Sequence, residues 1–261
     1  MNSLARQMKI FTPLLQGLLV CAALAAGADK AFGEKSGSDF SPRDRKLIVS
    51  ILRTLGPLIK DRQTAGRAPL LRWSELAHSL NNKQRLIIRN LRQYSGAAGD
   101  DEDPSRQPLV RLDDQYIRTN GQATAIPPQY VTPAVYDAYT RMSQDMQKDL
   151  GTALRIESGY RSPAYQLYLF LSHLPRYRFN IAKTSRHVAL PGRSEHGSLH
   201  HLAIDLINAE GINGDDNPRN FSVLPEYRWM TLHAKEYGFG LSFQEPTIDS
   251  AFEPWHWRHL Q

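Results

Sequence analysis

The chain has 261 residues, a length that suits one large core or two smaller units. A hydrophobic content of 41% and a charged content of 22% are ordinary for a globular protein and unlike those of a disordered chain. The formal net charge of +6 favours an anionic partner such as nucleic acid or the cell envelope, or simply promotes solubility.

Residues 1–28 have the pattern of an export signal. Arg6 and Lys9 precede a largely apolar run over 10–26, which ends in small residues that favour cleavage. An uncleaved membrane anchor is the alternative. Cys21 is the only cysteine, so the cleaved protein would have neither disulfides nor a thiol nucleophile. We expect an exported, periplasmic or otherwise extracytoplasmic protein with no nucleic-acid partner, in contact with a membrane only if the signal is uncleaved.

A disordered leader is expected over 29–40, followed by a small helical unit over 41–94. Ser41-Pro42 predicts a helix start, and residues 74–94 continue the helical spacing of apolar side chains. This second stretch also carries four basic residues, Lys83, Arg85, Arg89 and Arg92. They form either an anion-binding face or the solvated face of an amphipathic helix.

A linker is predicted over 95–108, where Gly, Asp and Pro gather, and a second domain over 109–261. In that domain, helices should begin at Pro133, Pro163 and Pro225, and strands should cover 153–158, 202–207, 239–243 and 255–260. Interleaved helices and strands indicate an α+β fold, a small antiparallel sheet with packed helices, preceded by the helical unit.

Two segments of this domain concentrate metal-binding side chains. The first runs from Ser194 to Asp205 and holds His196, His200 and His201. Extended chain from His201 to Asp205 would separate those two side chains by about 13 Å, too far for one metal ion. His196 can meet Asp205 if the chain folds back between them, so it is the preferred candidate, with His200 and His201 kept as alternatives.

The second segment is Glu253-Pro254-Trp255-His256. His256 offers a second imidazole, while Pro254 places Glu253 in a turn before the strand, from which it can act as a general base. A core histidine between aromatic side chains is the alternative for His256. Three protein ligands with a fourth position left for water are typical of catalytic zinc.

A third segment, Ser158-Gly159-Tyr160-Arg161-Ser162, joins a predicted strand to a predicted helix. The Arg161 guanidinium can bind a substrate carboxylate through two parallel hydrogen bonds. A surface arginine paired with a nearby acid is the alternative.

In this order, the three segments resemble the VanY-type D-alanyl-D-alanine carboxypeptidases, zinc peptidases that share the hedgehog fold. The resemblance covers about residues 105–261. It implies that His196, Asp205 and His256 bind zinc (Zn²⁺), that Glu253 is the general base, and that Arg161 orients the substrate. The remaining substrate contacts expected from these motifs are Ser158, Tyr160, Gln166, Ser194 and Trp255.

The first metal segment departs from the family pattern. Nine positions separate His196 from Asp205, where the family has seven, and His201 stands in place of a glycine. The expected function is removal of the C-terminal D-alanine from peptidoglycan stem peptides. An L,D-carboxypeptidase, a peptidoglycan endopeptidase and a non-catalytic peptidoglycan-binding scaffold are the alternatives.

Overall fold

The structure is a computed structural model, and it describes residues 39–96, 106–214, 218–244 and 252–260. The predicted export signal, nearly all of the leader and most of the predicted linker lie outside these ranges. Within them, no helix combines the length and the apolar character that crossing a bilayer requires.

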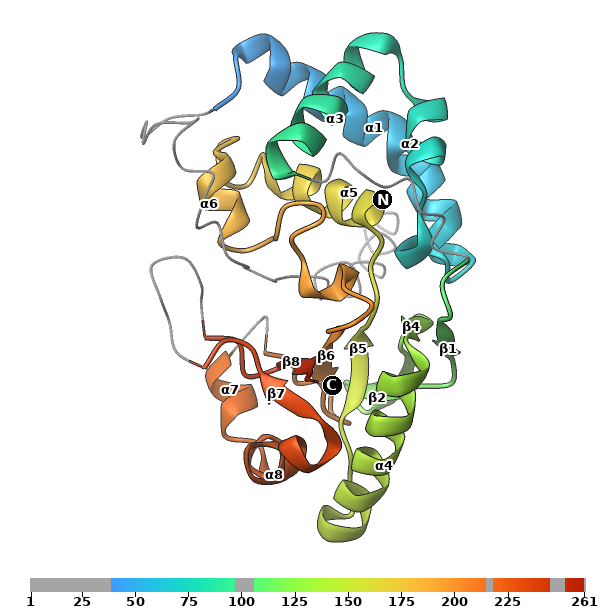
Figure 1. Cartoon of the computed structure of the whole chain (residues 1–261), viewed down its shortest axis with the longest axis vertical. Coiled ribbons are helices and arrows are strands. Elements are labelled where there is room, and N and C mark those ends of the chain that lie inside the picture. The colour runs from blue at the N-terminus through green and yellow to red at the C-terminus, as the bar shows by residue number, and fades with distance from the viewer. Residues whose placement is uncertain (1–38, 97–105, 215–217, 245–251, 261) are drawn as a thin grey trace, which may run out of the picture.

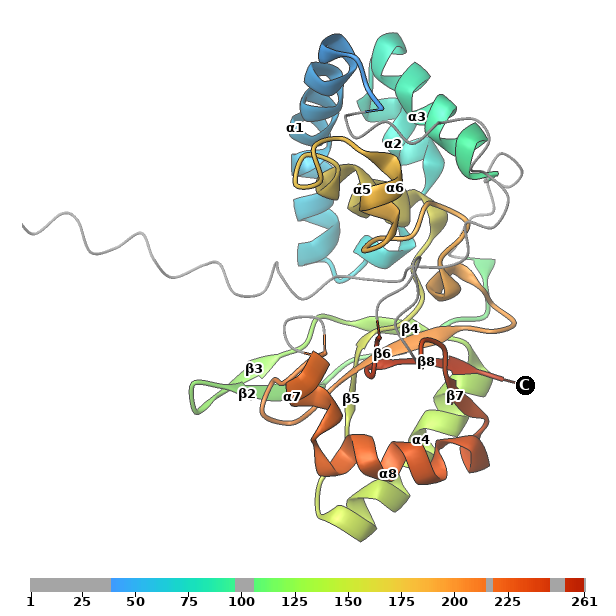
Figure 2. The ribbon, with the colours of Figure 1, turned by 90° about the vertical axis from the view of Figure 1, so that its left-hand side faces the viewer.

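Helices build one half of the molecule, at the top of Figures 1 and 2. Its elements are α1 (Pro42–Thr64), η1 (Ala68–Leu70), α2 (Trp73–Ser79), α3 (Asn82–Ser95), α5 (Pro163–His173) and α6 (Ile181–Ser185). Their apolar faces share one core, so α5 and α6, which follow the predicted linker in sequence, complete the helical unit expected over 41–94.

The helix starts follow local chemistry. The Ser41 hydroxyl accepts a hydrogen bond from the Asp44 amide at 3.2 Å, with Pro42 in the first turn of α1. The helical pattern predicted over 74–94 forms two helices, because the chain breaks between α2 and α3. Leu80 is extended there, and Asn81 and Gln84 form a reciprocal capping box that starts a new helix.

A four-stranded antiparallel sheet lies in the other half, in the order β5-β6-β8-β7. Its strands are β5 (Arg155–Ser158), β6 (Ala203–Ile207), β7 (Phe239–Leu241) and β8 (His256–His259). Two smaller antiparallel pairs accompany it, β1 (Val110–Leu112) with β4 (Gln129–Val131), and β2 (Tyr116–Thr119) with β3 (Gln122–Ala125).

A second core fills the space between this sheet and its helices. The remaining helical elements are α4 (Pro133–Leu150), η3 (Glu195–Gly197), α7 (Pro218–Ser222), α8 (Pro225–His233) and η4 (Ala234–Tyr237). In Figure 2, α4 and α8 run beneath the sheet, on the side away from the helical half. The predicted α+β fold with a small antiparallel sheet, packed helices and a preceding helical region is confirmed.

After β5, the chain crosses between the two cores twice. Residues 159–162 lead from β5 in the sheet core to α5 in the helical core, and residues 191–201 lead back to β6. We call these the outward and the return crossing segments. Figure 1 shows them side by side above the sheet, where they carry two of the predicted site segments.

Candidate metal centre and active site

Strand register sets the first part of the site. Asp205 on β6 lies opposite Ser158 on one side and opposite His256 on the other. Residues directly opposite each other in a sheet project to the same face. The sheet therefore brings these three side chains together, although they are far apart in sequence.

His256 is fully buried, and each of its ring nitrogens has an acidic neighbour. Its Nδ1 lies 2.8 Å from Asp205 Oδ1, and its Nε2 lies 2.9 Å from Glu195 Oε2. When Nε2–H donates to the Glu195 carboxylate, Nδ1 keeps its lone pair on the side of Asp205. A carboxylate that fixes the outer nitrogen in this way is the usual support of a metal-binding histidine.

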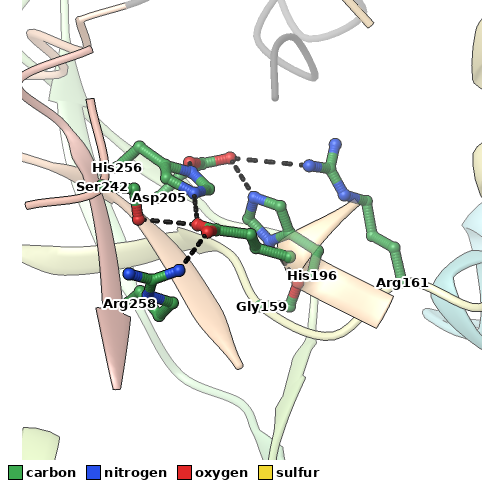
Figure 3. Close-up of polar contacts among 8 residues, drawn as sticks. Gly159, Arg161, His196, Asp205, Ser242, His256 and Arg258 are labelled. Atoms are coloured by element: carbon green, nitrogen blue, oxygen red, sulfur yellow. Dashed lines mark hydrogen bonds and ion pairs between the residues drawn. The ribbon is translucent and has the colours of Figure 1, made fainter. Parts of the chain in front are cut away.

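His196 is held in the complementary way. Its Nδ1–H donates to the Gly159 carbonyl at 2.7 Å, so the lone pair remains on Nε2. That nitrogen is buried 3.1 Å from Asp205 Oδ2, yet it forms no hydrogen bond within the described chain. Figure 3 shows both imidazoles directed at the Asp205 carboxylate.

Gly159 has no room for a side chain. A Cβ atom at this position would lie 2.2 Å from the Tyr130 carbonyl oxygen. The close approach is fixed by the Tyr160 amide, which donates to that same carbonyl at 2.6 Å. Only glycine allows the backbone to pass here and to present its own carbonyl to His196.

The three groups suit a zinc ion. One donor atom from each of His196, Asp205 and His256 lies within 4.8 Å of the other two. Donors about 2 Å from a tetrahedral centre are separated by about 3.3 Å, close to the two contacts that Asp205 makes. Two imidazoles and one carboxylate are a common ligand set of catalytic zinc. The buried Nε2 of His196 fits this use, because a buried polar atom without a partner is otherwise costly.

Protonation is consistent with metal binding. Burial, followed by the nearby Arg161 charge, lowers the pKa of His196 to about 4, so the imidazole is neutral at neutral pH. Burial alone would raise the pKa of Asp205. The neighbouring imidazoles of His196 and His256 outweigh it and hold that pKa below its usual value. A neutral imidazole and an ionised carboxylate are the forms that bind a metal.

The sequence reasoning missed Glu195. Besides His256, this carboxylate accepts hydrogen bonds from Ser242 Oγ at 2.6 Å and from the Arg258 guanidinium at 2.8 Å. Burial opposes its ionisation, but the bond from His256 and its other partners lower its pKa to about 2. The side chain is therefore an anion that orients the His256 ring. Its position beside His196 in Ser-Glu-His was the available signal.

Arg161 lies on the outward crossing segment with only 2% of its surface exposed. Its guanidinium approaches Asp205 Oδ2 at 3.9 Å, and its Nε and one terminal nitrogen have no hydrogen-bond partner in the described chain. Buried guanidinium groups need anionic or carbonyl partners. Arg161 is thus a candidate for binding an anionic group of a substrate beside the metal ligands.

Both crossing segments are bonded to each other and to the helical half. The Arg161 amide donates to the His196 carbonyl at 2.9 Å. Ser162 donates twice to the connection before α2, from its amide to Pro69 at 2.8 Å and from its hydroxyl to Leu71 at 2.6 Å. The helical half therefore helps to position Arg161 and His196.

The other predicted substrate contacts are buried, in differing settings. The hydroxyls of Ser158 and Ser194 have no hydrogen-bond partner in the described chain, the first opposite Asp205 and the second two residues before His196. Gln166 is directed instead at the chain just before the return segment, since its Nε2 donates to the Ala189 carbonyl at 2.8 Å. Gln166 therefore supports the loop that leads to His196.

Tyr160 and Trp255 belong to the sheet core. The Trp255 indole packs so tightly on Gly214 that a Cβ there would lie 1.7 Å from the ring. Its Nε1 is buried without a hydrogen-bond partner in the described part of the chain. Tyr160 is 5% exposed. Both side chains are fixed by packing, Tyr160 next to Arg161 and Trp255 next to His256 in sequence.

Glu253 precedes β8 in a turn, as its sequence context predicts. The His256 amide donates to the Glu253 carbonyl at 3.1 Å and closes the turn, and the Glu253 side chain is fully buried. Its burial and its position three residues before His256 make Glu253 the candidate general base.

His200 and His201, the alternatives to His196, are both exposed. The described chain brings neither into the cluster with Asp205 and His256. The two additional positions between His196 and Asp205 are taken up by the return segment, in which the His201 amide donates to Ser198 Oγ at 3.0 Å. The longer spacing therefore does not separate His196 from Asp205.

The family model of VanY, D-alanyl-D-alanine carboxypeptidase, matches residues 128–261, just over half of the chain. The chain therefore belongs to the VanY family of D-alanyl-D-alanine carboxypeptidases, and the predicted resemblance is confirmed. The match begins after the helices α1–α3. A search of curated protein sequences gives no match.

Solved structures similar to the chain include three carboxypeptidases. The LdcB LD-carboxypeptidase is 26% identical, with 59% of this chain and 68% of that chain covered and a TM-score of 0.45. A mutant of the vancomycin-resistance D,D-pentapeptidase VanY in complex with Zn(II) is 24% identical, with 57% and 80% covered and a TM-score of 0.40. The L,D-carboxypeptidase DacB from Streptococcus pneumoniae is 24% identical, with 50% and 66% covered and a TM-score of 0.39.

Proposed function

We propose that the protein is an exported, zinc-dependent D,D-carboxypeptidase that removes the C-terminal D-alanine from peptidoglycan stem peptides. The observation that carries the proposal is the arrangement around Asp205. His196 and His256 each have the outer ring nitrogen bonded to the protein and the other nitrogen directed at this carboxylate. Family membership supports peptidase activity on a D-alanyl-D-alanine end.

His196 Nε2, His256 Nδ1 and an Asp205 oxygen would hold the zinc ion. When bound, the ion would polarise the scissile carbonyl and lower the pKa of a water molecule. Ionised Asp205 would neutralise part of the charge of the zinc ion, and Glu195 keeps the His256 ring in the tautomer whose Nδ1 lone pair can bind it.

Glu253 acts as the general base. Its carboxylate takes a proton from the attacking water as the oxygen bonds to the carbonyl carbon of the scissile amide. The C–N bond then breaks, and Glu253 returns the proton to the departing amine of D-alanine. Because the Glu253 side chain is removed from solvent, the proton stays within the site between the two steps.

Arg161 binds the terminal carboxylate of the peptide. Its guanidinium nitrogens without partners in the described chain supply the donors, and its proximity to Asp205 supports a position for that carboxylate beside the scissile amide. The hydroxyls of Ser158 and Ser194 add hydrogen bonds to the peptide, while Trp255 and Tyr160 exclude water. Substrates without a free C-terminal carboxylate should be poor ones.

D-Alanine release from a muramyl pentapeptide tests the proposal. The purified protein should release one D-alanine, and chelation should stop the reaction until zinc is restored. Glu253→Ala should be inactive, and full activity of that variant would contradict the mechanism. Release from the tetrapeptide but not from the pentapeptide would establish an L,D-carboxypeptidase instead.

Mass spectrometry of digested sacculi separates the remaining alternatives. An endopeptidase would convert cross-linked dimers to monomers, whereas a carboxypeptidase shortens stem peptides by one alanine. A scaffold protein would bind sacculi and leave every fragment mass unchanged. The proposal requires the loss of one alanine from pentapeptide fragments.

A further inference from the structure

The positive charge of the chain is concentrated in the part that the VanY match does not include. Residues 41–95 hold twelve Lys and Arg against three Asp and Glu, a net charge of +9. Residues 96–261 hold sixteen against twenty, a net charge of −4. A contrast of this size between two parts of a chain indicates that the basic part meets an anionic partner.

The basic part contains a recess. A cavity of about 280 Å³ lies between α2 and α3. Apolar side chains that belong to the helical core form part of its lining, namely Trp73, Leu76, Leu80 and Ile88. Arg85, Arg89 and Arg92 add a basic side to the lining from a single face of α3, since they are spaced four and three residues apart.

Two of these arginines are held in place. The Arg92 guanidinium stacks over the Trp73 ring at 4.0 Å from the ring centroid, and Arg85 Nε donates to the Ala77 carbonyl at 2.8 Å. Arg89 is exposed and makes no hydrogen bond or ion pair with any described residue. Preorganised guanidinium groups beside an uncommitted one are suited to an incoming carboxylate, which they bind bidentately.

We propose that the cavity between α2 and α3 binds a carboxylate-bearing peptide of the cell wall, separately from the peptide under hydrolysis. A recessed cavity can accommodate a peptide that projects from the cell wall, whereas a flat membrane surface cannot enter it. Leu86 is the only large apolar side chain exposed on the described α1–α3, so this half offers little to insert into a bilayer. The assignment to cell-wall peptide rests on the proposed function.

The cavity is connected to the active site through the backbone. Trp73 follows Leu71 by two residues, and the Leu71 carbonyl accepts the hydroxyl of Ser162, next to Arg161. At the other end of α3, the Ser95 carbonyl accepts Arg193 Nε at 3.0 Å, one residue before Ser194. A cell-wall peptide bound at α3 would therefore hold the peptidoglycan in a fixed position relative to the two crossing segments.

Isothermal titration of the whole chain with C-terminally amidated hexaglutamate tests the site without hydrolysis. Arg89→Gln should weaken binding about tenfold, and Arg85→Gln/Arg89→Gln/Arg92→Gln should weaken it further. Arg43→Gln/Lys60→Gln/Arg67→Gln removes the same charge from exposed positions outside the cavity and should change affinity less than about twofold. Arg89→Gln breaks no bond with a described residue, so a loss of hexaglutamate affinity in this variant is not explained by unfolding.

Equal weakening by the two triple variants would overturn the proposal in favour of diffuse charge attraction. Binding of phosphatidylglycerol vesicles without binding of hexaglutamate would overturn it in favour of a membrane surface, and the absence of both would overturn it outright. D-Alanine release is measured separately. If hexaglutamate binds the cavity but no D-alanine is released, only the proposed function is refuted. If D-alanine is released but hexaglutamate does not bind the cavity, only the binding site is refuted.

Discussion

The sheet and the two crossing segments contribute to one site in different ways. Asp205 and His256 lie on adjacent strands, and their proximity follows from backbone register inside a single core. Arg161 and His196 lie on chain that passes between two cores, and their positions depend on bonds to Gly159, Pro69 and Leu71. The sheet sets half of the site by itself, whereas the other half requires the helical unit.

This difference gives the N-terminal helices a role beyond the proposed binding cavity. The VanY match begins after them, yet they share a core with α5 and bond to the outward segment. Loosening the helices should therefore disturb Arg161 and His196 before it disturbs Asp205 and His256. The following variants test this ranking, from the largest expected effect to the smallest.

Asp205→Asn removes the charge that both histidines and Arg161 face. We expect no measurable peptide hydrolysis and a loss of zinc affinity of at least about a hundredfold, because losing a ligand costs more than losing its supporting residue. Metal analysis after dialysis and the D-alanine assay are the measurements. Retained zinc and activity would show that the sheet does not supply the central ligand.

Glu253→Gln keeps the shape of the side chain and removes the base. We expect the catalytic rate constant to fall by about 10²- to 10⁴-fold with zinc content unchanged. Steady-state kinetics and metal analysis on the same preparation are required. Loss of zinc together with activity would instead place Glu253 among the ligands.

Glu195→Gln leaves His256 with a weaker partner. We expect zinc affinity to fall by about 10- to 100-fold, as is usual for residues that support a metal ligand. Ser242→Ala is the matched control, because it removes one bond to the same carboxylate and leaves its charge. Competition with a chelator measures both variants, and an equal effect of the two would contradict the role given to Glu195.

Ser162→Ala tests the crossing segments. It removes the hydroxyl that donates to Leu71 and caps α5 by accepting the Tyr165 amide at 3.1 Å. We expect the free energy of unfolding to fall by about 1–3 kcal/mol, and activity to fall a few-fold at temperatures well below unfolding. Denaturant titration and kinetics provide the two readouts.

Ser172→Ala provides the comparison for that variant. Ser172 lies on the same helix, but its hydroxyl donates to Leu169 within that helix. We expect a change of less than about 0.5 kcal/mol and normal activity. Similar activity losses in both variants would mean that general destabilisation, rather than the bond to the helical unit, disturbs the site.

Much of the sheet half could be predicted from the sequence. Alternation over 153–158 and a short apolar run over 202–207 located β5 and β6, and the strands predicted over 239–243 and 255–260 correspond to β7 and β8. Pro254 indicated that Glu253 lies in a turn. The position of Glu195 could not be derived, because its contact with His256 joins η3 to β8, which are 61 residues apart in sequence at the two side chains. Spacing within one segment carries no information about such a contact.

The helical half was predicted less well. The separate unit expected over 41–94 shares its core with α5 and α6, since apolar periodicity does not reveal which distant helix covers a given face. The β2–β3 hairpin was missed, although Asn120-Gly121 is a strong hairpin signal and both residues have positive φ, 52° and 76°. The nine-residue spacing after His196 left open a two-residue loop insertion or a changed ligand set, and the return segment takes up the additional length while His196 stays in the cluster.

Zinc content of protein purified without chelators tests the central claim most directly, measured on the natural chain and on two histidine variants. We expect about one zinc per chain, its loss in His196→Ala, and its retention in His201→Ala, which alters an exposed imidazole outside the cluster. The absence of zinc from the natural chain, or its loss in His201→Ala with retention in His196→Ala, would contradict the site described here.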